Sequence, residues 1–590
     1  MILFLTNADT ELLGLRTLAE ALPAELGALR ASNPHRLEAV PSLDGVDLVA
    51  VRLLGGRQAW AGPFDRLRVA SAEAAVPLLA FGGEAFFDRE LAEASSVPLP
   101  TLVGAFDYLV QGGPSNLEQF LRFVSDRVLG TEHGFGPATV VPECGPFGTR
   151  PRAPGRPTVA VIFYRAHYVA GNTRFVDELC GAIERAGANA VALYSYSLRS
   201  RESDDVHPVI DLLRGIGVDA VVTTVLAAGS MAESTECWDP GTLASLDVPV
   251  VQAICATTDA QTWVDAPIGL SPVDVAMSVA IPEFDGRIIS VPFSFKEEVD
   301  DGDGLGAAVN AYRTVPDRVA RVAGLAVALG RLRSIPVAER RVALVLSAYP
   351  TKRSRLGNAV GLDTPASVLD LLASMARAGY SLDPYAGTGD ELMAELADGL
   401  VYGESAAPAS AALGRFPVER YRDWFAGLPE PARRAVEEHW GAAPGAVSVE
   451  RSGADRSFYF SGLPFGNVVV AVQPPRGFGE NPVAVYHSPD LAPTHHYLAF
   501  YRWLEEGFGA HAVVHVGKHG TLEWLPGKGV GLSSACFPDA ALGNLPLVYP
   551  FVVNDPGEGT QAKRRTHAVV VDHLVPPLTR ADSYDDVAKL

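Results

Sequence analysis

The chain has 590 residues, of which 48% are hydrophobic and 20% are charged, and its formal net charge is −21. This composition is typical of a globular protein with three or four domains and excludes a largely disordered chain. The acidic balance, without a long Lys/Arg run, argues against a nucleic-acid partner. Five widely spaced cysteines form no C-x-x-C pair, so we expect a reduced, cytoplasmic protein without a zinc ribbon or disulfide framework.

The first 130 residues alternate short apolar runs with amphipathic patterns. The runs MILFLTN, VDLVAVRLLGG, VPLLAFGG and FDYLVQGG mostly end in turn-forming residues. Buried strands separated by helices predict a parallel sheet with helices on both faces. The opening run has no basic start and is too short for a signal peptide, so we interpret it as the first strand. No apolar run approaches membrane-spanning length, which predicts a soluble protein.

The middle of the chain predicts a linker followed by a second α/β domain. Residues 131–157 are rich in Pro and Gly and are expected to be the linker. The next segment, TVAVIFYRAHYVAGNTRFVDELCGAIERAGANAVALYSYSL, indicates a strand, an amphipathic helix that stops at Gly187, and a further strand. We expect this second domain to cover residues 158–335.

A third α/β region is predicted over residues 336–590. Pro365 suits the first turn of a helix capped by Asp363 or Thr364, which Gly379 ends. The chain between about 390 and 450 is rich in Ala, Glu and Arg and is expected to be helical, and strands return from 466. The whole pattern predicts an α/β protein with several doubly wound parallel-sheet domains and a helical insertion.

Three polar loops with glycines follow apolar strands of this third region, over residues 349–364, 473–487 and 512–530. Open α/β sheets bind ligands at the carboxyl ends of their strands, so these loops are candidate binding loops. A P-loop, an H-E-x-x-H helix and a G-x-S-x-G elbow are absent from the sequence. The residues alone therefore indicate an enzyme that binds a polar or anionic ligand.

The stretch AVVHVGKHGTLEWLPGKGV gathers several reactive side chains. His515, His519 and Glu523 would share one face of a helix, but the glycines at 517 and 520 disfavour a helix there. His519 and Glu523, in a glycine loop at a strand end, are the better functional candidates. A hydrogen-bonded core role explains His515 equally well, and Trp524 has loop packing as its alternative. We expect the pair His495–His496 to be a capping or solvent feature.

Five ordered motifs in residues 341–580 carry a family resemblance. They are YPTKRSRLGNAVGLDTPAS, PPRGF, HSPDLAPTHHYLAFYRWL, HVGKHGTLEWLPGK and YPFVVNDPGEGTQAKRRTHAVVVDHLVPPL. Together they resemble the large subunit of cobaltochelatase, a family related to the porphyrin-binding large subunit of magnesium chelatase. The resemblance implies ATP-dependent insertion of Co²⁺ into hydrogenobyrinic acid a,c-diamide, a tetrapyrrole of aerobic cobalamin biosynthesis. It also implies two smaller AAA+-type partner subunits that use ATP and Mg²⁺, which agrees with the missing P-loop.

Within that resemblance, Glu523 and His519 are the expected catalytic residues. Glu523 would accept a ring N–H proton, and His515, His519 and Glu523 would ligate Co²⁺ transiently before it enters the ring. Trp524 would stack on the ring. The carboxylates and amides at the rim of the ring need cationic partners, and the candidates are Arg353, Arg355, Arg476, Lys518, Arg564 and Arg565.

Two other functions stay open at this point. One is a magnesium chelatase H-type subunit that inserts Mg²⁺ into protoporphyrin IX, and the other is a non-catalytic tetrapyrrole-binding protein. Proteins of the resembled family have chains of about twice this length, so we expect the sequence to correspond to the N-terminal half and the chelatase core to be truncated at its C-terminus.

Overall fold

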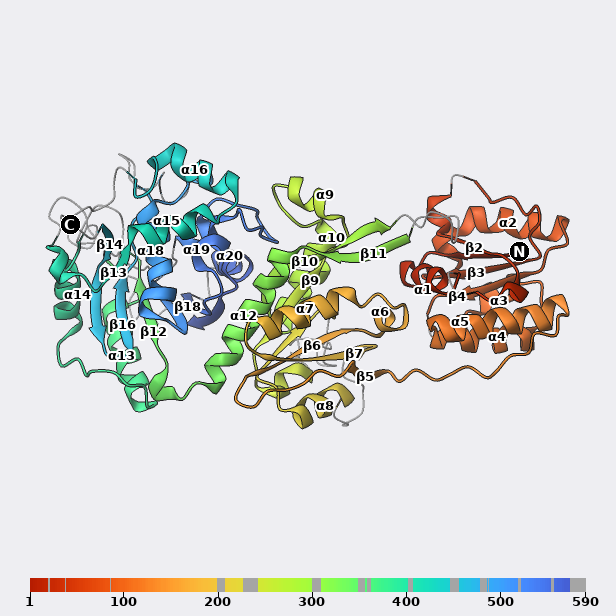
Figure 1. The fold of residues 1–590 in the computed structure, drawn as a ribbon, viewed down its shortest axis with the longest axis horizontal. Coiled ribbons are helices and arrows are strands. Elements are labelled where there is room, and N and C mark those ends of the chain that lie inside the picture. The colour runs from red at the N-terminus through yellow and green to blue at the C-terminus, as the bar shows by residue number, and fades with distance from the viewer. Residues whose placement is uncertain are drawn as a thin grey trace, which may run out of the picture.

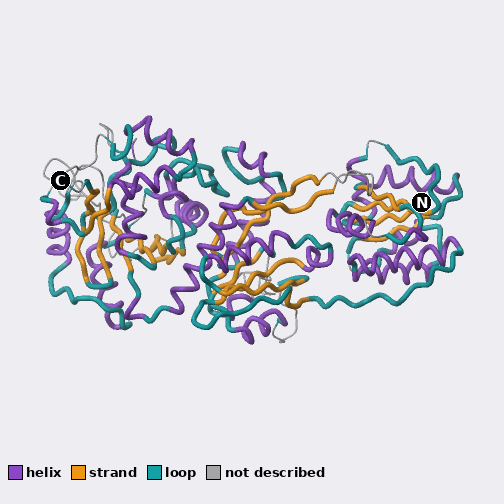
Figure 2. Tube along the Cα trace, viewed as in Figure 1, coloured by secondary structure: helices purple, strands orange, loops and turns teal. Residues whose placement is uncertain are grey.

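Three large β-sheets follow one another along the long axis of the molecule, with the N-terminus at one end and the C-terminus at the other (Figure 1). The structure is a computed structural model. It describes residues 1–19, 22–37, 39–84, 86–198, 207–226, 242–299, 309–347, 356–357, 362–401, 407–445, 456–477, 485, 488–517, 521–552 and 556–573. Figure 2 shows the strands as three separate groups, each surrounded by helices.

The first sheet is entirely parallel, with the order β2-β1-β3-β4. Its strands are β1 (Ile2–Thr6), β2 (Leu29–Ser32), β3 (Leu48–Leu53) and β4 (Leu78–Gly82). One face packs against α1 (Asp9–Ala19), α4 (Leu99–Gln111) and α5 (Gly113–Val124). The other face packs against α2 (Ala61–Glu73) and α3 (Arg89–Ala94). Two helical layers therefore bury the mostly apolar strands, as predicted.

The second sheet has seven strands in the order β11-β10-β9-β8-β6-β7-β5. They are β5 (Cys144–Phe147), β6 (Thr158–Tyr164), β7 (Asn189–Ser195), β8 (Ala220–Thr223), β9 (Val250–Cys255), β10 (Ile288–Val299) and β11 (Val309–Thr314). The two edge strands, β5 and β11, pair antiparallel, and the inner strands pair parallel. β5 lies inside the stretch expected to be a linker, so residues 131–157 are not irregular throughout.

Helices cover both faces of the second sheet. α7 (Arg174–Arg185) and α12 (Pro316–Ser334) pack on one face, and α8 (Pro208–Ile216) packs on the other. The short helices α9 (Ala260–Asp265), α10 (Pro272–Asp274) and α11 (Ile281–Phe284) follow β9, and α6 (Arg165–Val169) follows β6.

The third sheet has the order β15-β16-β12-β17-β18-β19, with only β15 antiparallel. Its strands are β12 (Val342–Leu346), β15 (Gly462–Phe465), β16 (Val468–Val472), β17 (Ala512–Val516), β18 (Leu547–Val552) and β19 (Val569–His573). α13 (Thr364–Arg377) and α14 (Gly389–Asp398) cover one face. The opposite core includes α15 (Val418–Ala426), α16 (Glu430–Trp440), α18 (His495–Arg502), α19 (Phe537–Leu542) and α20 (Pro556–Thr566).

These sheets confirm the predicted fold class of several doubly wound, mostly parallel α/β layers. The predicted cap of α13 is also confirmed, because Asp363 Oδ1 accepts a hydrogen bond from the Ala366 amide over 3.0 Å. The expected helical stretch is interrupted by β13 (Gly414–Pro417), which pairs with β14 (Ser457–Phe460). The proposed domain boundaries near 130, 157 and 335 stay predictions. Within the described ranges, no helix combines the length and the apolarity that a membrane crossing needs.

Candidate functional site

Parallel strands of the third sheet end at one edge, and the loops that follow them carry most of the predicted site residues. β16, β12, β17 and β18 are neighbours in parallel, so their carboxyl ends meet at the edge where open α/β sheets bind ligands. Gln473 follows β16 and His515 lies near the end of β17. Helix α18 contributes Tyr497 and Tyr501, and β18 contributes Tyr549. A connected polar cluster results.

Glu523 lies on a one-turn 3-10 helix, Leu522–Trp524, and its side chain is enclosed, at 1% exposure. The Tyr549 hydroxyl donates a hydrogen bond to Glu523 Oε1 over 3.1 Å. Burial, reinforced by the Glu523 carboxylate, raises the pKa of Tyr549 well above its ordinary value, so the phenol keeps its proton at neutral pH. Tyr549 therefore orients the carboxylate through Oε1.

The imidazole of His515 lies parallel to the rings of Tyr501 and Tyr549, with centroid distances of 6.4 and 5.7 Å. Its Nε2 is 3.1 Å from the Tyr501 hydroxyl. The side chain is buried, and this burial lowers the pKa of His515 to about 4. His515 is therefore neutral at neutral pH, with Nε2 already engaged inside the protein.

Gln473 sets the direction of the hydrogen bonds in this cluster. Its amide Nε2 donates to the hydroxyls of Tyr497 and Tyr501 over 3.0 and 2.7 Å. Its Oε1 accepts from Thr521 over 3.0 Å, so the Tyr497 hydroxyl donates to Thr521 Oγ1, 2.8 Å away. Since Tyr501 accepts from Gln473, its own proton is available to His515 Nε2. This pattern accommodates a His515 imidazole that carries its proton on Nδ1.

Two buried arginines donate hydrogen bonds to main-chain carbonyls of the Glu523 turn, which is the one-turn helix Leu522–Trp524 with Leu525. Arg476 is the first of them. Its Nη1 donates to the Trp524 carbonyl over 3.2 Å. Its Nη2 donates to the carbonyls of Ser488 and Leu491 over 2.8 and 3.1 Å. Arg476 thereby ties the loop after β16 to the turn that carries Glu523.

Arg565, on α20, is the second arginine. Its Nη1 donates to the Glu523 carbonyl, its Nη2 to the Leu525 carbonyl over 2.8 Å, and its Nε to the Lys528 carbonyl over 3.1 Å. The guanidinium is buried, and burial lowers its pKa from the ordinary value. One side chain therefore fixes both the turn and the chain that leaves it.

The rim-binding role expected of Arg476, Arg564 and Arg565 stays a prediction, and the contacts that the structure gives them are to the protein itself. Arg476 and Arg565 bind backbone carbonyls in the interior, because an irregular buried loop needs donors for its carbonyl groups. Arg564 binds both carboxylate oxygens of Glu283 in α11 through Nε and Nη2, over 2.9 and 2.7 Å. Trp524 is half-buried, and its ring-stacking role stays a prediction.

The other predicted site residues are Arg353, Arg355, Lys518 and His519, and they lie outside the described residues. Across the ranges that the structure describes, no group of three or more His, Cys, Asp or Glu residues is arranged to hold a metal ion. The proposed Co²⁺ ligation by His515, His519 and Glu523 is therefore a prediction. His515 would ligate Co²⁺ either through Nε2, after giving up the hydrogen bond to Tyr501, or through Nδ1.

Sequence reasoning misplaced one histidine pair and missed the tyrosines. His495 and His496 were expected to be a capping or solvent feature, but both are buried: His495 Nδ1 lies 2.8 Å from the Tyr421 hydroxyl and His496 Nε2 lies 2.8 Å from the Tyr459 carbonyl. Thr494, not either histidine, caps α18. The i, i+4 spacing of Tyr497 and Tyr501, which puts both on one helix face, was the available signal for the cluster.

A cavity lies away from this cluster. Its volume is about 330 Å³, and it is lined by residues of α12 and by Ala186, Ile335, Glu505, residues 509–511 and residues 544–546. Residues 511 and 546 directly precede β17 and β18. The cavity therefore opens at the amino edge of the sheet, opposite the edge that carries Glu523.

Comparison with known proteins places the chain in a family. Residues 106–590 match the family model described as CobN/Magnesium Chelatase. The chain belongs to that family. The fold, the five motifs and the cluster at the carboxyl edge are therefore features of a CobN/magnesium chelatase protein.

Named relatives in this family include both chelatase types. The aerobic cobaltochelatase subunit CobN of Pseudomonas aeruginosa is 40% identical over 608 residues, which cover 100% of this chain and 48% of that protein. The H-type subunit of the magnesium chelatase of Cereibacter sphaeroides is 32% identical over 515 residues, covering 81% and 42%. The solved catalytic subunit of cobaltochelatase from Mycobacterium tuberculosis has 46% identity and a TM-score of 0.80, covering 100% and 49%.

These comparisons confirm the resemblance to the cobaltochelatase large subunit. The chain spans about half the length of the curated relatives it matches.

Proposed function

We propose that this chain supplies the tetrapyrrole-binding and metal-inserting part of a cobaltochelatase large subunit. Co²⁺ is the substrate metal, and hydrogenobyrinic acid a,c-diamide of aerobic cobalamin biosynthesis is the ring substrate. The observation that carries the proposal is the 46% identity over the whole chain to the catalytic subunit of cobaltochelatase from Mycobacterium tuberculosis. The magnesium-chelatase relative is 32% identical over 81% of the chain, which favours the cobalt branch.

The chemistry of metal insertion gives Glu523 its proposed task. A ring must lose its N–H protons while the metal ion sheds water, and a base within hydrogen-bond reach of the ring centre lowers the barrier. The Glu523 carboxylate is enclosed and is oriented by the Tyr549 hydroxyl. A fixed carboxylate in a water-poor site accepts a proton without first reorganising its surroundings.

The neighbouring groups are proposed to act with Glu523. His519 remains our second catalytic candidate and the main candidate ligand for the incoming ion, because it lies in the same loop four residues earlier. His515 is better suited to positioning, since its Nε2 faces Tyr501 and its ring lies along Tyr549. In this scheme His515 keeps the Tyr549 hydroxyl aligned with Glu523.

The proposal extends to partners and location. Two smaller AAA+-type subunits would bind and hydrolyse ATP with Mg²⁺, and this chain would need no nucleotide site of its own. A cytoplasmic location is proposed because the five cysteines of the sequence are widely spaced and form no C-x-x-C pair, as expected in a reducing compartment.

The test is the Glu523→Gln variant in the complete chelatase complex with ATP, Co²⁺ and the ring. Glutamine keeps the shape and can still accept from Tyr549, but it cannot take a ring proton. We expect the insertion rate to fall by roughly 100-fold or more, while ring binding, followed by absorbance, changes little. Glu438→Gln, at an exposed position of α16, is the matched control. Unchanged insertion by Glu523→Gln would remove Glu523 from the mechanism.

The ring and metal are tested separately from the base. This chain is titrated with hydrogenobyrinic acid a,c-diamide and with protoporphyrin, and the complex is assayed with Co²⁺ and Mg²⁺. Insertion of Mg²⁺ into protoporphyrin, without insertion of Co²⁺ into the corrin-type ring, would assign the chain to the magnesium branch. Tight ring binding with no insertion of either metal would make it a carrier.

A further inference from the structure

The loop that leaves the Glu523 turn is docked on the second α/β unit, which contains β5–β11. Lys528 Nζ donates to the carbonyls of Val264 and Ala266, over 2.9 and 2.6 Å, at the end of α9. The same ammonium lies 5.7 Å from the centre of the Trp263 ring. Two carbonyls and an aromatic face satisfy a buried ammonium group, which would otherwise be costly to enclose.

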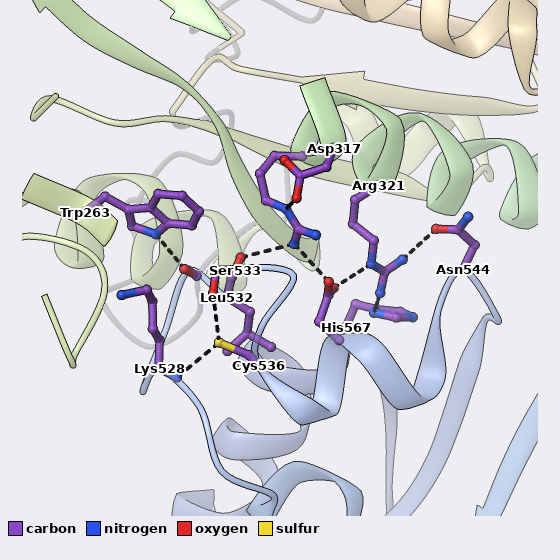
Figure 3. Close-up of polar contacts among 12 residues, drawn as sticks. Trp263, Asp317, Arg321, Lys528, Leu532, Ser533, Cys536, Asn544 and His567 are labelled. Atoms are coloured by element: carbon purple, nitrogen blue, oxygen red, sulfur yellow. Dashed lines mark hydrogen bonds and ion pairs between the residues drawn. The ribbon is translucent and has the colours of Figure 1, made fainter. Parts of the chain in front are cut away.

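Backbone contacts extend this docking beyond Lys528. Trp263 Nε1 donates to the Gly531 carbonyl over 2.7 Å, and the Val530 amide donates to the Ile268 carbonyl over 3.0 Å. Figure 3 shows Trp263 and Lys528 side by side, with the segment through Ser533 and Cys536 beneath the helix that carries Arg321. Residues 528–531 are therefore joined to residues 263–268 at several consecutive points.

Helix α20 makes a second connection between the two units. Arg564 forms its paired bonds to Glu283 of the second unit. The next residue, Arg565, binds the carbonyls of Glu523, Leu525 and Lys528. Adjacent residues of one helix thus contact the second unit and the Glu523 turn, so displacement of the second unit acts on the turn through both α20 and Lys528.

We propose that Lys528 and the pair Arg564–Arg565 are positioning residues that make the location of Glu523 depend on the docking of the second α/β unit. This rests on the proposed function of Glu523 as a proton acceptor. None of the three side chains needs to touch the ring or the metal. Small displacements matter here, because moving a reacting group by about 1 Å is enough to slow a reaction by roughly 100-fold.

The first test replaces Lys528 with Met, which keeps the length of the side chain and removes the ammonium. Amide hydrogen exchange of this chain reports on the turn through the Trp524, Leu525, Lys528 and Val530 amides, all of which donate hydrogen bonds. We expect these amides to exchange at least ten-fold faster, and insertion by the complete complex to slow by roughly ten-fold or more. The affinity for the ring should change less than about two-fold, because a displaced Glu523 carboxylate slows proton transfer without removing a contact that binds the ring.

Lys563→Met on α20 is the matched control, because Lys563 is a neighbouring lysine that takes no part in the proposed connection. Glu283→Gln is a milder second variant that weakens only the Arg564 connection and leaves Lys528 in place. It should give the same pattern with a smaller loss of rate, and it serves if Lys528→Met does not fold.

The outcomes separate this inference from the proposed function. If Glu523→Gln abolishes insertion but Lys528→Met and Glu283→Gln match the wild type in exchange and rate, the positioning inference is overturned and the function stands. If Glu523→Gln inserts metal normally, the proposed function of Glu523 fails, and the inference that rests on it fails with it. Faster exchange and slower insertion in both positioning variants, with ring binding retained, support the inference.

Discussion

Asp539 offers the sharpest test of how the second and third units are held together. This α19 carboxylate is 7% exposed, and its oxygens accept from Arg318 over 2.9 Å and from Arg321 over 2.6 Å, both on α12. Burial opposes its charge, but the two guanidinium groups outweigh burial and hold the pKa of Asp539 below its ordinary value. Figure 3 shows the Arg321 side of this group, with its further contacts to Asn544 and His567.

The Asp539→Asn variant removes the negative charge and keeps the shape. Arg321 and Arg318 then lose this buried counterion, while Asp317 stays 3.1 Å from Arg318 Nε, and breaking a buried ion pair in this way costs about 3–5 kcal/mol. We expect the low end, about 3 kcal/mol, because asparagine still accepts one hydrogen bond. Urea unfolding at pH 7, followed by Trp fluorescence, measures the change, with the exposed Asp265→Asn as control. A loss below about 1 kcal/mol would show that the ion pairs do not hold the interface.

Acid should destabilise the protein before its carboxylates titrate, because burial lowers the pKa of His515 and His496 to about 4 and that of His567 to about 3. The unfolded chain binds these protons below about pH 6.5 and the folded chain does not, so stability is complete above that pH and falls as the pH decreases. At pH 5.5 the free energy of unfolding should be lower by about 1.4 kcal/mol for each histidine. Urea midpoints that stay constant from pH 7.5 to 5.5 would contradict this prediction. Gly269→Ala should weaken the docked loop by about 2 kcal/mol, since Gly269 has φ +100° and an added Cβ would meet the Val530 carbonyl. Gly286→Ala is its control, because that residue also has positive φ but open space around it, and equal destabilisation of the two variants would refute a role for the Val530 contact.

The sequence was sufficient for the layered architecture because continuous apolar runs such as Val468–Val472 can be buried only in a sheet covered on both faces. The antiparallel edge strands were harder to predict. β5 is a four-residue strand whose sequence contains Gly145 and Pro146, and its pairing with β7 comes from tertiary contact rather than local propensity.

The site was only partly predictable for a different reason. A loop motif indicated Glu523 from its residue type and its place after a strand, but a sequence gives the charge of an arginine and not its direction. Arg476 and Arg565 were expected to bind a ligand; their guanidinium groups bind carbonyls of the protein, and ligand binding by them stays a prediction. The tyrosines of α18 and β18 were hidden because an aromatic ring in an apolar pattern looks like core, while its hydroxyl carries the polar network.

The arginines bind main-chain oxygens, and this has a consequence for how the turn can vary between related proteins. A carbonyl group is the same in every residue, so the side chains at 524 and 525 can be exchanged without changing the acceptors that Arg476 and Arg565 require. Inserting or deleting one residue would shift those oxygens by roughly 3.8 Å, the spacing of successive Cα atoms, which is beyond hydrogen-bond reach. We therefore expect evolution to change the contacts to the substrate by replacing side chains on a turn of constant length.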